Sequence, residues 1–237
     1  VTPIPQIIDA AQLAINSGQT NILIEKPGSL YPEKLISLSK NIIDQKIRIG
    51  YNRLLYPSFH KLKYLVELEG GITSCHFNFT EWTHRINFEK YPSEVYQRWG
   101  ISNSLHVISM AFELIGMPET MSTYNSGKLD WHPSGSVFTG SGISTNSIPF
   151  SFHANWDSGG RWGVEIMTKE NIYRLTPLEE LFVCKKGSII WEPISLNSAY
   201  PEVKTGIAEE IAVMLNDKKE KEIEFITLEK ASEYNKL

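Results

Sequence analysis

Apolar and polar positions follow one pattern up to about residue 52 and another pattern beyond it. Apolar residues at helical spacing predict helices over residues 7–16 and 32–45. Short apolar runs predict strands over residues 21–25 and 46–51. This order of helix, strand, helix and strand is typical of parallel strands joined by right-handed crossovers. Residues 1–52 are therefore predicted to be the C-terminal half of a doubly wound parallel sheet.

Beyond residue 52 the pattern changes to short β-rich runs with a few helices. Helices are predicted over residues 57–68 and 103–115, and an alternating strand over 72–79. Glycine-rich and polar turns separate six further predicted strands, over residues 136–143, 149–156, 162–168, 172–175, 181–184 and 189–191. A charged segment, residues 217–224, is predicted to be a solvated turn. The expected fold class is α/β plus α+β, with a large, mostly antiparallel open sheet built as a meander and helices on one of its faces.

Composition excludes several kinds of partner. The net charge is −4 and the basic residues are scattered, which argues against nucleic acid and anionic membranes as partners. No apolar run approaches the roughly 18 residues of a membrane span. The two cysteines lie far apart, which suits a reducing cytoplasm, and the six histidines show no metal-ligand spacing. We therefore expect a cytoplasmic protein without a metal site.

The strand over 21–25 ends abruptly in Glu25, Lys26, Pro27 and Gly28. Pro27 has no N–H to donate to a sheet, so the strand stops there. Lys26 is thereby placed at the carboxyl end of a strand, where open α/β sheets bind ligands. Two interpretations stay open: a solvated charge pair at a strand exit, or a catalytic lysine.

The helix over 103–115 carries one histidine. Leu105, Ile108, Phe112 and Ile115 form an apolar face, and Ser102, His106, Ser109 and Glu113 form a polar one. An imidazole at His106 is suited to exchanging a proton near physiological pH. The alternative is a histidine that only hydrogen-bonds to a neighbouring domain.

Taken in order, several motifs resemble the Gfo/Idh/MocA family of NAD(P)-dependent oxidoreductases. They are Thr2-Pro3, the helix end over 14–19, Ile24-Glu25-Lys26-Pro27, Gly50-Tyr51-Asn52-Arg53 followed by Pro57, and the pair His106 and Gly116. The resemblance runs through the whole chain. It implies a remnant of a dinucleotide-binding (Rossmann) domain over residues 1–52 and a substrate-binding and oligomerisation domain over 53–237.

The resemblance also implies site residues and a cofactor, NAD or NADP. Lys26 and His106 would be the catalytic acid/base pair, and Thr2, Pro3, Glu25 and Lys26 would contact the cofactor. Ser102, Arg85 and Trp99 are expected to contact the substrate. The phosphate-binding G-x-G-x-x-G is expected to precede Val1, so the chain is expected to be a truncated, inactive fragment.

Two departures from the family pattern affect the expected chemistry. Ser102 and Ser109 stand where the family has aspartates, and a serine cannot act as a carboxylate base.

Residues 129–135 and 156–162 resemble members from surface-polysaccharide gene clusters. We therefore expect hydride transfer between nicotinamide and a sugar or nucleotide-sugar carbinol. The alternatives are a non-catalytic family member serving sugar binding or oligomerisation, and a lectin-like module. The open sheet is expected to form a homodimer or homotetramer.

Overall fold

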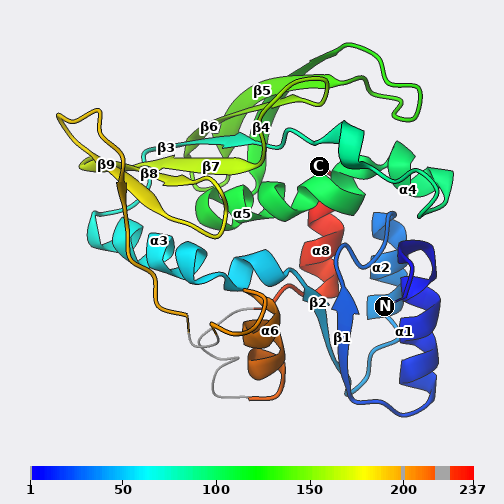
Figure 1. Cartoon of the computed structure of the whole chain (residues 1–237). Coiled ribbons are helices and arrows are strands. Elements are labelled where there is room, and N and C mark those ends of the chain that lie inside the picture. Colours follow the sequence, from blue (N-terminus) through cyan, green and yellow to red (C-terminus); the bar gives the residue numbers. More distant parts are fainter. Residues whose placement is uncertain (1, 199–200, 217–224) are drawn as a thin grey trace. The chain divides into compact units, whose positions relative to one another are not determined.

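The computed structural model describes residues 2–198, 201–216 and 225–237 (Figure 1). The chain folds into two compact units. Unit 1 comprises residues 1–52, 88–105 and 207–237, and unit 2 comprises residues 53–87 and 106–206. The predicted domains divide the chain once, after residue 52, whereas the chain passes from one of these units to the other four times. The roles assigned to the predicted domains stay predictions, and the predicted turn over 217–224 lies outside the described residues.

Unit 1 is built on a two-stranded parallel sheet. Strands β1 (Asn21–Glu25) and β2 (Lys46–Gly50) pair in register from Asn21 and Lys46 to Glu25 and Gly50. This pairing confirms the predicted parallel strands. The α-helices among the described residues of this unit are α1 (Ile7–Asn16), α2 (Pro32–Ser39), α4 (Ser93–Gln97), α6 (Ile207–Met214) and α8 (Leu228–Tyr234).

Helix α2 ends six residues earlier than the sequence predicts. Ile42 and Ile43 continue the helical spacing, but Asn41 donates its backbone N–H to Leu38 and its side chain to Gln12, which tightens the end of the helix. Ile43, whose spacing led to the longer predicted helix, is 85% exposed and contributes nothing to a core.

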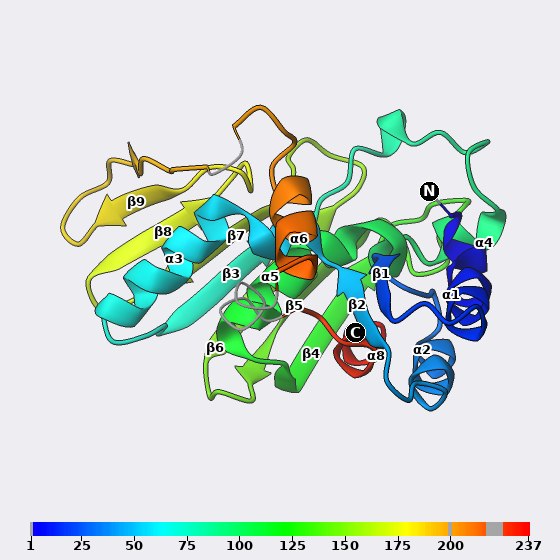
Figure 2. The same ribbon diagram turned by 90° about the horizontal axis from the view of Figure 1, so that it is seen from below.

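The C-terminal helix α8 completes the core of unit 1 by packing on α2 and β2 (Figure 2). Leu35, Ile49 and Tyr234 are fully buried there, and the Ile49 N–H donates to the Ile226 carbonyl over 2.9 Å. Each buried aliphatic side chain contributes about 1.5–3 kcal/mol to the stability of the fold. The parallel sheet therefore depends on a helix formed almost two hundred residues later.

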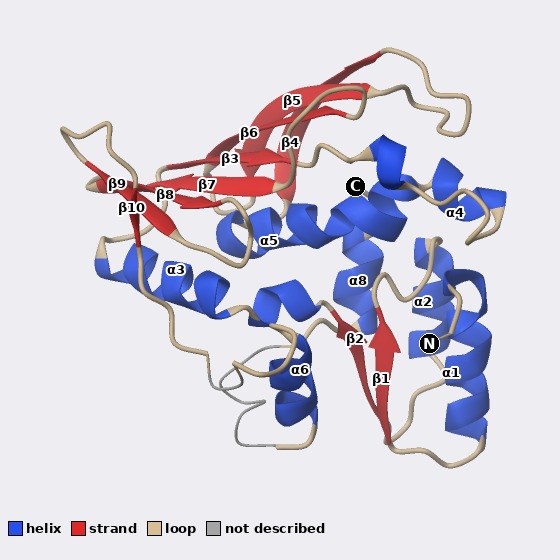
Figure 3. Ribbon diagram, in the orientation of Figure 1, coloured by secondary structure: helices blue, strands red, loops and turns tan. Residues whose placement is uncertain are grey.

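Unit 2 contains an eight-stranded sheet with α3 (Pro57–Leu68) and α5 (Leu105–Ile115) along one face (Figure 3). The strands are β3 (Ser74–Asn78), β4 (Pro118–Ser126), β5 (Val137–Ser144), β6 (Pro149–Asn155), β7 (Gly163–Met167), β8 (Asn171–Leu175), β9 (Phe182–Lys185) and β10 (Glu192–Pro193). The mostly antiparallel open sheet and its helices confirm the predicted fold class.

The sheet is not a simple meander. Its order is β10-β9-β8-β7-β3-β6-β5-β4, so β3 lies between two antiparallel ladders and runs parallel to β6. The sequence prediction missed β4, which is an edge strand of polar, exposed residues without apolar alternation. The strand predicted over 189–191 is wrong, because Ile189 and Ile190 are exposed and pairing starts at Glu192.

Aromatic rings join the sheet of unit 2 to α5. The Phe77 and Phe112 rings lie 5.5 Å apart, and those of Phe112 and Phe150 lie 5.3 Å apart, edge to face. Such pairs add about 0.5–1.5 kcal/mol beyond the burial of their area. This packing holds α5, and with it His106, against β3.

Candidate functional site

In unit 1, Lys26 is buried at the carboxyl end of β1. Its side chain is only 7% exposed, and its Nζ donates to the Ser102 carbonyl over 2.8 Å and to the Asn103 carbonyl over 3.4 Å. The first of the two open interpretations, a solvated lysine at a strand exit, is therefore wrong. Glu25 beside it is exposed.

Gly28 fixes the turn that follows Lys26. Its φ is +79°, and a Cβ there would meet the Leu35 side chain at 2.9 Å. Any other residue would therefore be strained and crowded at this position. The glycine lets the chain turn away from the sheet immediately after Lys26 and Pro27.

The partner of Lys26 is a π-helical turn, Gly100–Ser104. Such turns occur frequently at functional sites. The Ser102 Oγ is buried and donates to the Val95 carbonyl over 3.0 Å. Its hydroxyl proton is thus engaged within unit 1, and its oxygen is left as an acceptor. Trp99 stacks on Tyr96, with ring centroids 5.7 Å apart.

The other predicted cofactor contacts of unit 1 are on its surface. Thr2 and Pro3 are exposed before the 3-10 turn of Ile4–Gln6, and Pro3 accepts the N–H of Gln6. Glu25 pairs with Gly50 across the two strands. The structure thus brings Lys26 and Ser102 together and places Glu25 at the same end of the sheet.

A second carboxyl group in unit 1 was not predicted. Glu210 on α6 is 6% exposed, and a Cβ at Gly50 would meet its Oε1 at 2.7 Å. Burial raises the pKa of Glu210 to about 7, and the negative charge of Glu25 adds to the effect. In the sequence Glu210 looks like an ordinary charge in a surface helix, so no sequence signal identifies it.

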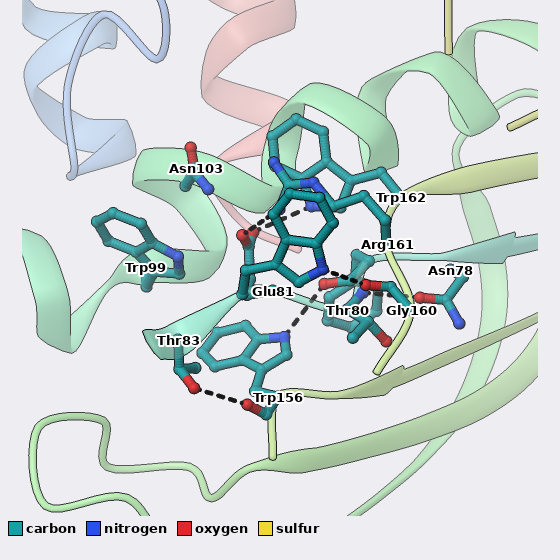
Figure 4. Close-up of polar contacts among 12 residues, drawn as sticks. Asn78, Thr80, Glu81, Thr83, Trp99, Asn103, Trp156, Gly160, Arg161 and Trp162 are labelled. Carbon is teal, nitrogen blue, oxygen red and sulfur yellow. Dashed lines mark hydrogen bonds and ion pairs between the residues drawn. The ribbon is translucent and has the colours of Figure 1, made fainter. Parts of the chain in front are cut away.

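In unit 2, a buried carboxylate lies three residues after the end of β3. Glu81 is 2% exposed; its Oε1 accepts the Trp162 indole N–H over 3.1 Å, and its Oε2 pairs with Arg161 over 3.2 Å (Figure 4). The sequence prediction missed Glu81, although a carboxylate shortly after a strand was a usable signal.

Hydrogen bonds fasten the loops around Glu81 to each other. Trp156 donates its indole N–H to the Phe79 carbonyl over 3.1 Å, and the Thr83 Oγ1 donates to the Trp156 carbonyl over 2.9 Å (Figure 4). These bonds join the segment after β3 to the segment after β6. The site is therefore held in place without a ligand.

His106 belongs to this cluster in unit 2. Its ring lies 5.8 Å from that of Trp162, and the Arg53 guanidinium lies 5.0 Å from the same Trp162 ring. Burial lowers the pKa of Arg53, while Tyr56 and Glu179 act in the opposite direction. Both interpretations of His106, structural or acid/base, stay open.

Arg85 lies on the exposed 3-10 turn Thr83–Arg85, with its guanidinium 4.9 Å from the centre of the Trp82 ring. Lys26, Ser102 and Trp99 belong to unit 1, whereas His106 and Arg85 belong to unit 2. Within the described ranges, no three metal-ligating side chains gather, and no helix is long and apolar enough to cross a membrane.

Chemically, the two units offer different groups. Unit 1 provides an amine fixed by two backbone carbonyls at the end of a parallel sheet. Unit 2 provides an imidazole beside an indole, with a buried carboxylate and several guanidinium groups around it. Amines and imidazoles both transfer protons, and guanidinium groups bind anions.

Comparison with known proteins establishes the fold. No family model matches the sequence, and no curated protein matches it. UDP-N-acetylglucosamine 3-dehydrogenase GnnA from Acidithiobacillus ferrooxidans is similar in structure, with 15% identity and a TM-score of 0.75 over 100% of this chain and 73% of that chain. Levoglucosan dehydrogenase in complex with NADH and levoglucosan has 17% identity and a TM-score of 0.72, over 99% of this chain and 74% of that chain.

A third similar structure is an oxidoreductase from Agrobacterium radiobacter in complex with NAD+, L-tartaric acid and magnesium. It has 11% identity and a TM-score of 0.75, over 99% of this chain and 73% of that chain. The whole of this chain therefore has the fold of about three quarters of these oxidoreductases.

Proposed function

We propose that this chain belongs to an NAD(P)-dependent oxidoreductase that transfers a hydride between nicotinamide and a carbinol carbon of a sugar or nucleotide sugar. The observation that carries the proposal is the buried Lys26, fixed at the carboxyl end of β1 by the carbonyls of Ser102 and Asn103. The fold shared with dehydrogenases of sugars and nucleotide sugars supports it.

In this proposal Lys26 and His106 handle the proton. Loss of a hydride from a carbinol carbon yields a carbonyl only if the hydroxyl proton also leaves, so a positioned base is required. Two carbonyls hold the Lys26 amine in one place, which reduces the entropy lost when it meets the substrate. The role of His106 is proposed from its place in the sequence motif.

The cofactor of the proposal is NAD or NADP, which supplies the hydride acceptor. We propose that Thr2, Pro3, Glu25 and Lys26 contact it. An exposed carboxylate such as Glu25, at the end of a parallel strand, is suited to accept hydrogen bonds from ribose hydroxyls. The 237 residues contain no G-x-G-x-x-G, so this chain does not supply that form of pyrophosphate cradle.

We also propose that the protein is cytoplasmic and forms a homodimer or homotetramer through its open sheet. Both cysteines are free thiols, as a reducing compartment favours. Tyr124 and Ile143 are exposed large apolar side chains on the same face of β4 and β5, which supports an interface there. Light scattering of Tyr124→Lys against the wild type tests this part, and an unchanged mass would contradict it.

The test of the main proposal combines cofactor titration with turnover, in the natural protein. NADH and NADPH are titrated by fluorescence, and oxidation of sugars and UDP-sugars is followed at the absorbance of the reduced cofactor. We expect Lys26→Met to lower kcat by about 10²-fold or more. Lys34→Met, which changes an exposed lysine of α2, should leave kcat unchanged.

Lys26→Arg separates a loss of catalysis from a loss of folding. The arginine keeps a cation that can donate hydrogen bonds to the carbonyls of Ser102 and Asn103. Circular dichroism should show it folded, and its turnover should still be low. If the wild type binds neither cofactor, or if Lys26→Met turns over normally, the oxidoreductase proposal is wrong. The alternative would then be a non-catalytic sugar-binding or oligomerisation module, which the serine at 102 in place of an acidic residue favours.

A further inference from the structure

In unit 2, the guanidinium groups of three arginines alternate with the indole rings of two tryptophans in one stack. Arg85 and Arg161 lie 4.9 and 5.0 Å from the centre of the Trp82 ring. Arg161 and Arg53 lie 4.2 and 5.0 Å from the Trp162 ring. We call the series Arg85, Trp82, Arg161, Trp162 and Arg53 the arginine ladder.

The arginine ladder runs from the surface of the unit to its interior. Arg85 is exposed, Trp82 and the Arg161 side chain are each 38% exposed, and Trp162 is only 4% exposed. At the buried end, the carboxylate of Glu81 balances the positive charge of Arg161 and accepts hydrogen bonds from both Arg161 and Trp162. No described residue forms an ion pair with Arg85. The exposed end therefore carries an excess of positive charge.

Both indole rings are fixed by hydrogen bonds. Trp82 donates its Nε1–H to the Gly160 carbonyl over 2.6 Å, and Trp162 donates to Glu81. A guanidinium lying over a ring uses its face for that contact and keeps its N–H donors at its edges. The ladder therefore holds the donors of Arg85 and Arg161 in place before any ligand arrives, which lowers the entropy cost of binding.

We propose that the exposed end of the arginine ladder, Arg85 and Arg161, binds the diphosphate of a nucleotide-sugar substrate. Arg85 adds a positive charge that no described carboxylate pairs, and the two guanidinium groups around the Trp82 ring keep up to nine N–H donors beside the one that Arg161 gives to Glu81, which matches two phosphates better than a single carboxylate. This inference rests on the proposed function, because it specifies the substrate of the same enzyme as a nucleoside diphosphate sugar.

The test measures equilibrium binding without turnover, by titration calorimetry. The probes are uridine diphosphate, inorganic pyrophosphate, glucuronate and NADH, each added to the wild type, Arg85→Gln and Arg174→Gln. Arg174 is the matched control, because its guanidinium also lies over an indole, 3.7 Å from the Trp191 ring, in the same unit. Arg85 is exposed, so its replacement leaves the core of the unit intact.

We expect uridine diphosphate to bind the wild type and Arg174→Gln equally, and Arg85→Gln about tenfold or more weakly, the loss typical of a charged hydrogen bond. Pyrophosphate should show the same order. Equal binding of uridine diphosphate to Arg85→Gln and the wild type would overturn the proposal. So would tighter binding of glucuronate than of uridine diphosphate, since the anion recognised would then be a carboxylate.

Two further outcomes separate this inference from the proposed function. If Arg85→Gln weakens NADH and not uridine diphosphate, the diphosphate at the ladder is that of the cofactor and the substrate assignment fails. If uridine diphosphate binds through Arg85 but the protein does not oxidise or reduce any sugar, the binding site stands and the oxidoreductase proposal fails.

Discussion

Glu210 should make the stability of this protein fall as the pH rises. Its carboxyl lies buried against Gly50, and among the described residues its Oε1 has no hydrogen-bond donor. Burial raises the pKa of Glu210 from an ordinary value of 4.5 to about 7 in the folded protein, with the charge of Glu25 as the second cause. Below pH 4.5 the group is protonated in both the folded and the unfolded state.

Between pH 4.5 and about 7 the unfolded chain releases this proton while the folded protein keeps it. The free energy of unfolding therefore falls through this window and stays at its lower level above pH 7. Since one pKa unit corresponds to about 1.4 kcal/mol, the loss is on the order of 3 kcal/mol. Glu210→Gln is neutral at every pH and should escape this loss.

Urea unfolding followed by circular dichroism measures the effect at pH 4.5, 6, 7 and 8.5. Glu210→Gln and the wild type should be similar at pH 4.5, and the variant should be more stable by about 3 kcal/mol at pH 8.5. Glu25→Gln should reduce the dependence on pH, because it removes the second cause. Glu33→Gln, at an exposed position on α2, serves as the control. A stability difference between Glu210→Gln and the wild type that does not change with pH would refute the reasoning.

Three further substitutions and one control variant test the packing, each by urea unfolding. Ser102→Ala should cost about 1–2 kcal/mol, because a buried carbonyl loses its donor, and an unchanged midpoint would contradict that bond. Trp162→Phe should cost about 2–3 kcal/mol by removing the indole donor to the buried Glu81, and an unchanged midpoint would reject the stabilising role of this bond. Gly142→Ala should cost about 1–3 kcal/mol, because its Cβ would collide with a backbone carbonyl of β4. Gly159→Ala enters open space and should change stability by less than about 0.5 kcal/mol, so equal losses at the two glycines would reject the steric argument.

Patterns of apolar spacing predict those helices and strands whose apolar residues face the core at regular intervals. The helix predicted over 57–68 forms as α3, and the two apolar runs before residue 52 pair as parallel strands. Edge strand β4 was not predictable by the same means, because its exposed residues carry no apolar alternation. The position of β3 beside β6 also depends on pairing between Cys75 and Phe150, which periodicity along the chain does not encode.

The candidate site divides in a similar way. A charged strand end and a motif name Lys26 and Ser102 as candidates from the sequence, and the structure adds the hydrogen bond between them; their roles stay predictions. Glu81 and Glu210 owe their properties to distant residues. The Trp162 that bonds Glu81 lies 81 positions later, and the pKa of Glu210 is raised first by burial and then by the charge of Glu25, far from it in the sequence. In the sequence, a glutamate that will be buried looks the same as an exposed one, because the residues that surround it come from distant parts of the chain.

The discontinuous make-up of unit 1 sets the order in which a growing polypeptide can fold. Strands β1 and β2 leave the ribosome before unit 2, yet α8, which packs on α2 and β2, is synthesised after the whole of unit 2. At roughly 5–20 residues per second, this delay is on the order of ten to forty seconds. Throughout that time the surfaces of α2 and β2 on which α8 packs lack their cover, and exposed apolar surface of this kind is what chaperones bind on growing chains.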